Sequence, residues 1–109
     1  MNPRSANTAI HCLDAIDDLA RRMFDVLTGG PAVEHDLRNA LQGCAYIQLE
    51  AECHPRRGEL ERHLESLKTS LEGLAAPRLR PGDSKTRRLQ RVLSATTELR
   101  RFLASETAS

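Results

Sequence analysis

The chain has 109 residues, a net charge of +1 and only 3% aromatic residues. This length suits one domain with a modest core, and we expect a single helical domain over residues 1–109. No run approaches the roughly 18 to 20 apolar residues of a membrane span, and an odd count of three cysteines does not suggest a disulfide framework. We therefore expect a cytoplasmic protein with reduced thiols.

The small net charge hides an asymmetry along the chain. Residues 1–76 carry 8 Lys and Arg against 12 Asp and Glu, whereas residues 77–109 carry 8 against 3. The two parts should attract each other, either within one molecule or between two. Because salt screens exposed charges beyond about 8 Å, this attraction should orient packing more than it stabilises the fold.

The first predicted helix covers residues 8–28. Asn7 is a suitable N-cap, because its side-chain oxygen can accept a free backbone N–H of the first turn. Apolar residues from Cys12 to Leu27 recur every three or four positions and form a broad face, while aspartates and arginines occupy the other side. The sequence Gly29-Gly30-Pro31 then ends the helix.

The second predicted helix covers residues 32–54 and has apolar residues on two sides. One face carries Val33, Leu37, Ala40, Leu41, Cys44, Ile47 and Ala51. Tyr46, Leu49 and Cys53 lie nearly opposite, and Gly43 in the middle would allow another helix to approach closely. Four thin helices offer this second face no obvious mate within the chain, so we expect a contact surface for a second copy or another protein. The alternative is that these residues are ordinary exposed apolar side chains.

The third predicted helix covers residues 57–75 and has a narrow leucine edge. Its leucines are spaced four, three, four and three residues apart, which is the pattern of a helix that packs along a seam: Leu60, Leu64, Leu67, Leu71 and Leu74. Such a helix is not stable alone, because most helical stability in proteins comes from burial of the apolar face.

The fourth predicted helix covers residues 84–104, after a loop that contains Pro77, Pro81 and Gly82. Asp83 or Ser84 should cap its first turn. Its apolar line repeats the three-four spacing and includes one polar member: Leu89, Val92, Thr96, Leu99 and Leu103. The four helices together predict an all-α, four-helix bundle-like fold that is dimeric.

No catalytic or metal-binding motif stands out. The pairs His11-Cys12 and Cys53-His54 lack the spacing of zinc ligands, and Glu59 with His63 is an isolated pair. His35-Asp36 resembles a metal-binding dipeptide, but the further ligands of such domains are missing. No family signature surrounds Cys53 as a nucleophile. We therefore expect a protein that is not an enzyme and takes no cofactor and no metal.

Nucleic-acid binding is an alternative based on the basic last part of the chain. Arg87, Arg88 and Arg91 share one face of the fourth helix and could follow phosphates. The sequence pI of 7.8, the lack of interleaved aromatic residues and the acidic first part argue against it. A solvated face, or a complement to acidic helices, is the simpler interpretation.

The whole chain resembles the small quorum-sensing antiactivators that bind LuxR-family transcription factors. The similar features are an acidic first helix that ends in Gly29-Gly30-Pro31, the leucine-rich stretch from His63 to Leu74, and a basic final helix. The resemblance implies a helical homodimer that binds the ligand-binding domain of a LuxR-type activator and covers the surface through which it dimerises. The activator could then not hold two DNA half-sites together.

The sequence thus predicts a regulatory protein-binding module. We expect the protein interface to include Tyr46, Leu49, Cys53, Gly43 and the aromatic Phe24 of the first helix. Two other functions stay open: nucleic-acid binding through the basic patch of Arg87, Arg88 and Arg91, and a secretion-type chaperone that shields another protein's helix.

Overall fold

The computed structural model describes residues 3–25, 31–50, 52, 54–76 and 81–108. Within these residues the chain forms four α-helices and no strand, so the all-α prediction is confirmed. The helices are α1 (Pro3–Asp25), α2 (Pro31–Glu50), α3 (Arg57–Ala75) and α4 (Lys85–Ala108).

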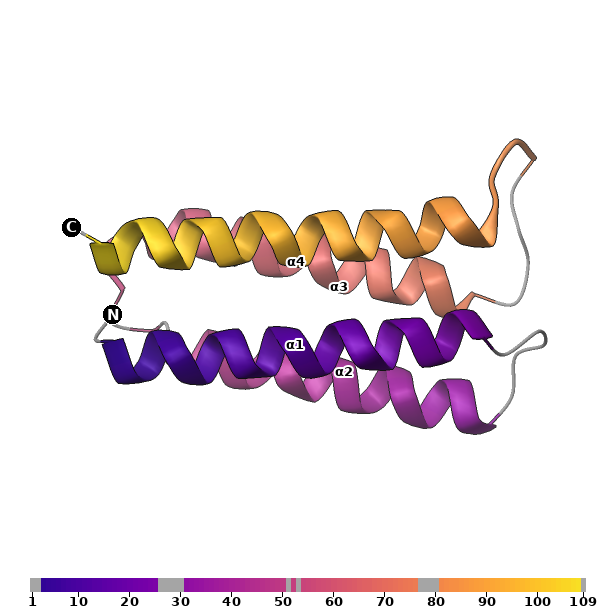
Figure 1. The fold of residues 1–109 in the computed structure, drawn as a ribbon, viewed down its shortest axis with the longest axis horizontal. Coiled ribbons are helices and arrows are strands. Elements are labelled where there is room, and N and C mark those ends of the chain that lie inside the picture. Colours follow the sequence, from indigo (N-terminus) through magenta and orange to yellow (C-terminus); the bar gives the residue numbers. More distant parts are fainter. Residues whose placement is uncertain (1–2, 26–30, 51, 53, 77–80, 109) are drawn as a thin grey trace.

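The helices run alternately up and down along the 43 Å long axis of the molecule (Figure 1). α1 and α2 form one antiparallel pair, and α3 and α4 form the other. α4 packs against α1 and α2 packs against α3, which closes the four helices into a bundle. The two chain termini lie at the same end of the bundle.

The core is built from the apolar stripe that each helix turns inward. All five leucines of the α3 stripe are buried, with at most 4% of any side chain exposed. α1 contributes Ala9, Leu13, Ile16, Ala20 and Met23, with the same four-three spacing. On α4 four members of the predicted line are fully buried, Val92, Thr96, Leu99 and Leu103, and the fifth, Leu89, is partly buried against the core. This shared spacing is what lets four thin helices pack along common seams.

The bounds of α3 agree with the prediction, whereas those of the other helices differ. α1 begins at Pro3, five residues earlier than expected, because proline is well suited to a first helical turn. Asn7 therefore lies inside α1 and is not its N-cap. The predicted end of this helix falls on residues 26–30, outside the described part of the chain.

The ends of α2 and α4 also differ from the prediction. α2 ends at Glu50 and not at His54; at His54 itself, the following Pro55 disfavours a helical conformation. The Arg56 backbone N–H donates to Nδ1 of the buried His54 at 2.9 Å, within the connection to α3. α4 continues past Ala104 to Ala108, because no glycine or proline interrupts it.

A buried polar cluster ties α1 to α4. The Thr96 hydroxyl donates to Asp17 Oδ1 at 2.7 Å, and both side chains are buried. The Arg100 guanidinium donates to the other Asp17 oxygen and, at 2.8 Å, to Asp14. The expected attraction between the acidic and basic parts of the chain is thus present within one molecule.

Candidate functional site

The outer side of α2 carries exposed apolar side chains. Tyr46 is 44% exposed and Leu49 is 66% exposed, and they are the large exposed hydrophobic residues of the described chain. The charge of the Glu50 carboxylate, together with the hydrogen bond it accepts from the phenol, raises the pKa of Tyr46. The structure thus places two of the predicted interface residues side by side on one helix, open to solvent.

The other predicted interface residues lie elsewhere or outside the described part of the chain. A Cβ atom added to Gly43 would lie 3.3 Å from the Ile16 side chain, so this glycine serves the close approach of α1 and α2 within the chain. Phe24 is half-buried near the end of α1, at the end of the hairpin far from Leu49. Cys53 falls outside the described residues.

The predicted basic patch is divided by burial. The Arg88 side chain is only 7% exposed, whereas that of Arg91 is 57% exposed. Arg88 donates to Asp83 Oδ2 at 3.3 Å and to the carbonyl of Ala76 at 3.0 Å, which fastens the start of α4 to the end of α3. Arg88 is therefore a structural residue, and the three arginines do not form one open face.

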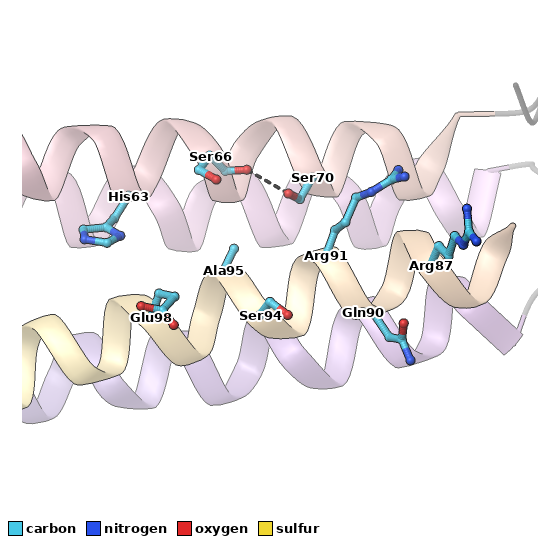
Figure 2. Close-up of a pocket in the computed structure, with 9 residues that line it drawn as sticks. All are labelled: His63, Ser66, Ser70, Arg87, Gln90, Arg91, Ser94, Ala95 and Glu98. Carbon is cyan, nitrogen blue, oxygen red and sulfur yellow. Dashed lines mark hydrogen bonds between the residues drawn. The ribbon is translucent and has the colours of Figure 1, made fainter. Parts of the chain in front are cut away.

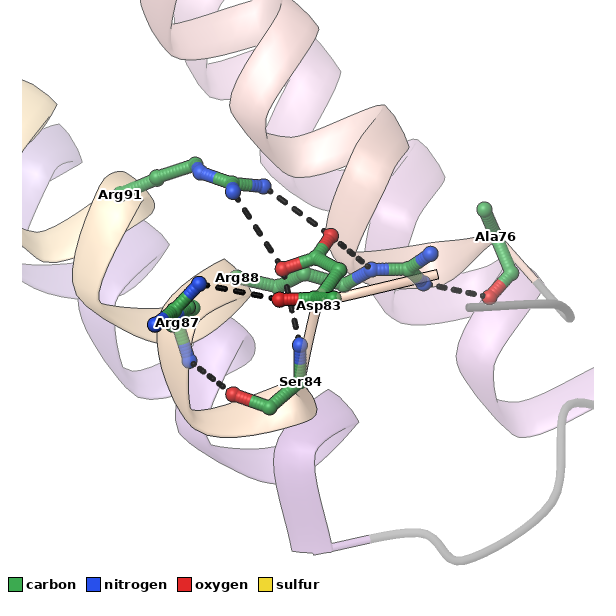
Figure 3. A network of polar contacts seen from close by, with 7 residues as sticks. Ala76, Asp83, Ser84, Arg87, Arg88 and Arg91 are labelled. Carbon is green, nitrogen blue, oxygen red and sulfur yellow. Dashed lines mark hydrogen bonds and ion pairs between the residues drawn. The ribbon is translucent and has the colours of Figure 1, made fainter. Parts of the chain in front are cut away.

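Asp83 is the centre of this network (Figure 3). Its Oδ1 accepts the backbone N–H of Ser84 at 2.8 Å, and its carboxylate also pairs with Arg91. The Ser84 N–H, and after it the two arginines, lower the pKa of Asp83, while desolvation acts in the opposite direction. We define Asp83, Arg88 and Arg91 as the loop clamp.

The cap of α4 agrees with the sequence prediction. The Ser84 hydroxyl accepts the backbone N–H of Arg87 at 3.1 Å, as an N-cap side chain does (Figure 3). The Arg87 guanidinium donates to the carbonyl of Gly82 at 2.9 Å. Gly82 has a φ of +82°, a conformation that glycine adopts without strain. Arg87 is exposed like Arg91, but its guanidinium binds a carbonyl oxygen and not the Asp83 carboxylate.

A groove of about 590 Å³ follows the outer seam between α3 and α4 (Figure 2). Small side chains lie along its middle, and Arg87 and Arg91 lie toward one end, with His63 and Glu98 toward the other. Its lining residues are His63, Ser66, Ser70, Arg87, Gln90, Arg91, Ser94, Ala95 and Glu98. We call this surface the α3–α4 groove.

Sequence reasoning missed the α3–α4 groove. Ser66 and Ser70 are four residues apart, as are Gln90 and Ser94, so each pair lies on one side of its helix. These spacings were a usable signal for a face without bulky residues. They did not reveal that the two faces adjoin along one seam, because that depends on the rotation of each helix in the bundle.

A second cluster that sequence reasoning missed surrounds Phe102. The rings of His54 and His63 lie 5.4 and 5.2 Å from the Phe102 ring centre, and the Arg56 guanidinium lies 4.8 Å from it. This arrangement packs the connection between α2 and α3 against α4. It accounts for the burial of His54, which is 4% exposed.

The residues Cys44, Asp36 and His35, which could serve as nucleophiles or metal ligands, are buried or paired with neighbouring side chains. Burial raises the pKa of Cys44 to about 11, which keeps that thiol protonated and weakly nucleophilic at neutral pH. Asp36 is buried and pairs with Arg22 at 3.4 Å, and His35 contacts Asn39. Within the described residues no three His, Cys, Asp or Glu side chains are grouped so that they could hold a metal ion.

Among the helices of the described chain, none has both the length and the apolar character required to cross a membrane. The comparisons with known proteins do not assign the chain to a family: it matches no family model, no curated protein and no solved structure.

Proposed function

We propose that this chain is a non-catalytic regulatory protein that forms a homodimer through α2 and acts as an antiactivator. Its target would be the ligand-binding domain of a LuxR-type quorum-sensing transcription factor. The observation that carries the protein-binding part of the proposal is the exposed apolar pair on α2. The choice of target comes from the resemblance of the whole chain to antiactivators of this kind.

The exposed face of α2 has properties that suit a second copy. Arg38, Gln42, Tyr46 and Leu49 fall within an arc of about 80° at 100° per residue. Arg38 is exposed, and none of the described residues forms an ion pair with it. The face thus combines apolar area with a cation that pairs with no carboxylate among the described residues.

An antiparallel pairing of two α2 helices about Gln42 would use each of these residues. Tyr46 of each copy would then lie against Arg38 of the other, where the guanidinium can stack on the phenol ring. The same pairing is isologous, so it closes at two copies and does not extend into a fibre. A standard interface takes about 800 Å² from each partner, roughly an eighth of the 6791 Å² surface of this chain.

Nucleic-acid binding is the less favoured function. A phosphate backbone needs an extended row of open cations, but Arg88 is buried and Arg91 shares its charge with the carboxylate of Asp83, so the positive surplus is confined to one end of α4. Glu98 also lies along the same outer side of α4. A secretion-type chaperone would share the exposed apolar face, and the binding experiment below separates it from an antiactivator.

The homodimer is tested by adding charge to the apolar pair. We expect Tyr46→Asp with Leu49→Asp to reduce the mass in light scattering from twice to once the 12.1 kDa of the chain, because two buried carboxylates would have no partner. Gln48→Asp is the matched control, since Gln48 is exposed on another side of α2. An unchanged mass in the double variant would refute the α2 dimer.

The antiactivator function is tested with purified proteins. We expect the full chain to bind the isolated ligand-binding domain of a LuxR-type activator and to abolish a gel shift by the whole activator on its palindromic DNA site. A chain that binds the domain without reducing the gel shift would contradict the antiactivator mechanism. A chain that binds no such domain would leave the chaperone function as the better explanation of the exposed face.

A further inference from the structure

The α3–α4 groove and the apolar pair on α2 are separate surfaces. The groove is lined by residues of α3 and α4, while the exposed side chains of Tyr46 and Leu49 belong to α2 in the other pair. A homodimer formed through α2 would therefore leave the groove open. Such a dimer could contact a target through the groove without dissociating.

The shape of the groove suits one α-helix. The lining residues on α4 extend from Arg87 to Glu98, which corresponds to about 16 Å, or three helical turns, at 1.5 Å per residue. Ser66, Ser70, Ser94 and Ala95 form the part of the lining that has no bulky side chain. Helix axes pack 8–10 Å apart depending on the side chains between them, so small residues permit the closest approach.

The charge of the groove is uneven along its length. At the loop end, Asp83 supplies one negative charge against the three positive charges of Arg87, Arg88 and Arg91. The N-terminus of α4 lies at the same end, and the positive end of its helix dipole adds to the potential there. At the other end, Glu98 pairs with Arg101 at 3.3 Å, which leaves no such surplus.

We propose that the α3–α4 groove binds an α-helix of the partner protein, with acidic side chains of that helix facing Arg87 and Arg91. This inference rests on the proposed protein-binding function and assigns it a surface and a partner chemistry. The helix would run antiparallel to α4, because its own negative C-terminal end then lies at the positive end of the groove.

A helical protein segment fits this groove better than a nucleic acid does. A phosphate backbone would pass from the arginines to Glu98, and no Phe, Tyr or Trp side chain lines the groove for base stacking. The serine hydroxyls and Gln90 can instead bond polar groups at the edge of a bound helix. The surplus of positive charge is confined to one end of the groove, which suits a partner helix that carries only a few acidic side chains.

The probe is a three-turn amphipathic peptide with alanine and leucine on one side and two glutamates in its last turn. A second peptide carries lysines in place of the glutamates. We expect the acidic peptide to bind the full chain in fluorescence anisotropy and the lysine peptide to bind about tenfold more weakly or not at all. In NMR titrations the amide signals of Ser66 and Ala95 should shift, while those of Gln42 and Ala45 should not.

Two variants locate the binding. Arg87→Glu reverses a charge at the end of the groove, and Ser94→Tyr fills its middle; both residues are exposed, so the fold should be retained in circular dichroism. Each variant should bind the acidic peptide about tenfold more weakly than the unchanged chain does. Arg21→Glu is the control, because it makes the same charge change on an exposed residue of α1. Equal binding by both groove variants and the control would overturn the proposal.

The same variants distinguish this inference from the proposed function. If a LuxR-type ligand-binding domain binds the chain, both groove variants should bind that domain more weakly. The Tyr46→Asp, Leu49→Asp monomer should still bind it. If that domain does not bind but the acidic peptide does, the proposed target fails and the groove stands. If neither peptide binds, or if a fluorescein-labelled DNA duplex binds through Arg87 while the peptides do not, the groove proposal is overturned.

Discussion

α4 is held by two clusters of aspartate and arginine that differ in the sequence separation of the residues they join. We define the first, Asp14, Asp17, Thr96 and Arg100, as the interhelix tie, since it joins α4 to α1. The loop clamp of Asp83, Arg88 and Arg91 joins the start of α4 to the preceding loop and, through the Ala76 carbonyl, to α3. The same residue types therefore perform a long-range and a local task.

The difference shows why equal charges along a helix are not equally available to a partner. In the interhelix tie two carboxylates and one hydroxyl surround one arginine, whose side chain is 28% exposed. In the loop clamp the one carboxylate of Asp83 pairs with two arginines, and Arg87 binds the neutral Gly82 carbonyl. This leaves a net positive charge at the end of the α3–α4 groove. The predictions below test this contrast through the free energy of unfolding.

The largest effect is expected from the interhelix tie. Asp17→Ala should lower the free energy of unfolding by about 3 kcal/mol, because it leaves the Thr96 hydroxyl and part of the Arg100 charge without their buried partner. Thr96→Val should cost only about 1 kcal/mol, since Asp17 keeps Arg100. Urea denaturation at pH 7 measures both. A smaller loss for Asp17→Ala than for Thr96→Val would contradict the assigned role of the ion pair.

The loop clamp should respond according to burial. Arg88→Ala should cost about 2 kcal/mol, because it removes a buried side chain that bonds both Asp83 and the Ala76 carbonyl. Arg91→Ala should cost less than about 1 kcal/mol, since an exposed ion pair contributes little. The two variants are matched in chemistry and share Asp83, so equal losses in urea denaturation would show that burial is not the deciding factor.

The pH dependence of stability should report the lowered pKa of Asp83. Because the folded chain holds this carboxylate ionised below its ordinary pKa of 3.8, the unfolded chain binds more protons there. The contribution of Asp83 is therefore present above that value and is lost as the pH falls through the folded pKa. Asp83→Asn should reduce the acid-side slope in denaturation between pH 5 and 2. Arg87→Ala should retain it, as Arg87 binds the Gly82 carbonyl and not Asp83.

The smallest effect on stability is expected at Arg87 itself. Arg87→Ala should change the free energy of unfolding by no more than about 0.5 kcal/mol, because the side chain is exposed and its bond to Gly82 competes with water. The same variant should bind the acidic peptide more weakly. A large loss of stability with unchanged peptide binding would show that Arg87 has a structural role like the loop clamp and does not contribute to binding in the groove.

The helices and their inward stripes could be predicted from the sequence because periodicity is a local property. The leucines of α3 and the Ser84 cap are specified by residues within one or two turns. Thr96 was recognisable as a polar residue in an apolar line, but its partner was not. Asp17 lies 79 residues away in the chain and is reached only when α1 and α4 pack together.

The interface prediction shows the same limit. The spacing of Tyr46 and Leu49 indicated an outward apolar face on α2, and both side chains are exposed. Gly43 was grouped with them, but it meets Ile16 of α1, since the rotation of α2 in the bundle decides which side of a two-sided helix faces inward. Arg88 was likewise grouped with Arg87 and Arg91 by helical spacing, which cannot show that the loop folds back over it.

By itself the sequence determined that this chain forms helices with inward apolar stripes, that its acidic and basic parts attract, and where α4 begins. Only the tertiary structure decided which charges are consumed inside the molecule, which arginine stays open, and that the small residues of α3 and α4 line one groove. The physical reason is range: helix formation and capping depend on neighbours within a few residues, whereas burial and charge pairing depend on contacts between residues far apart in the chain.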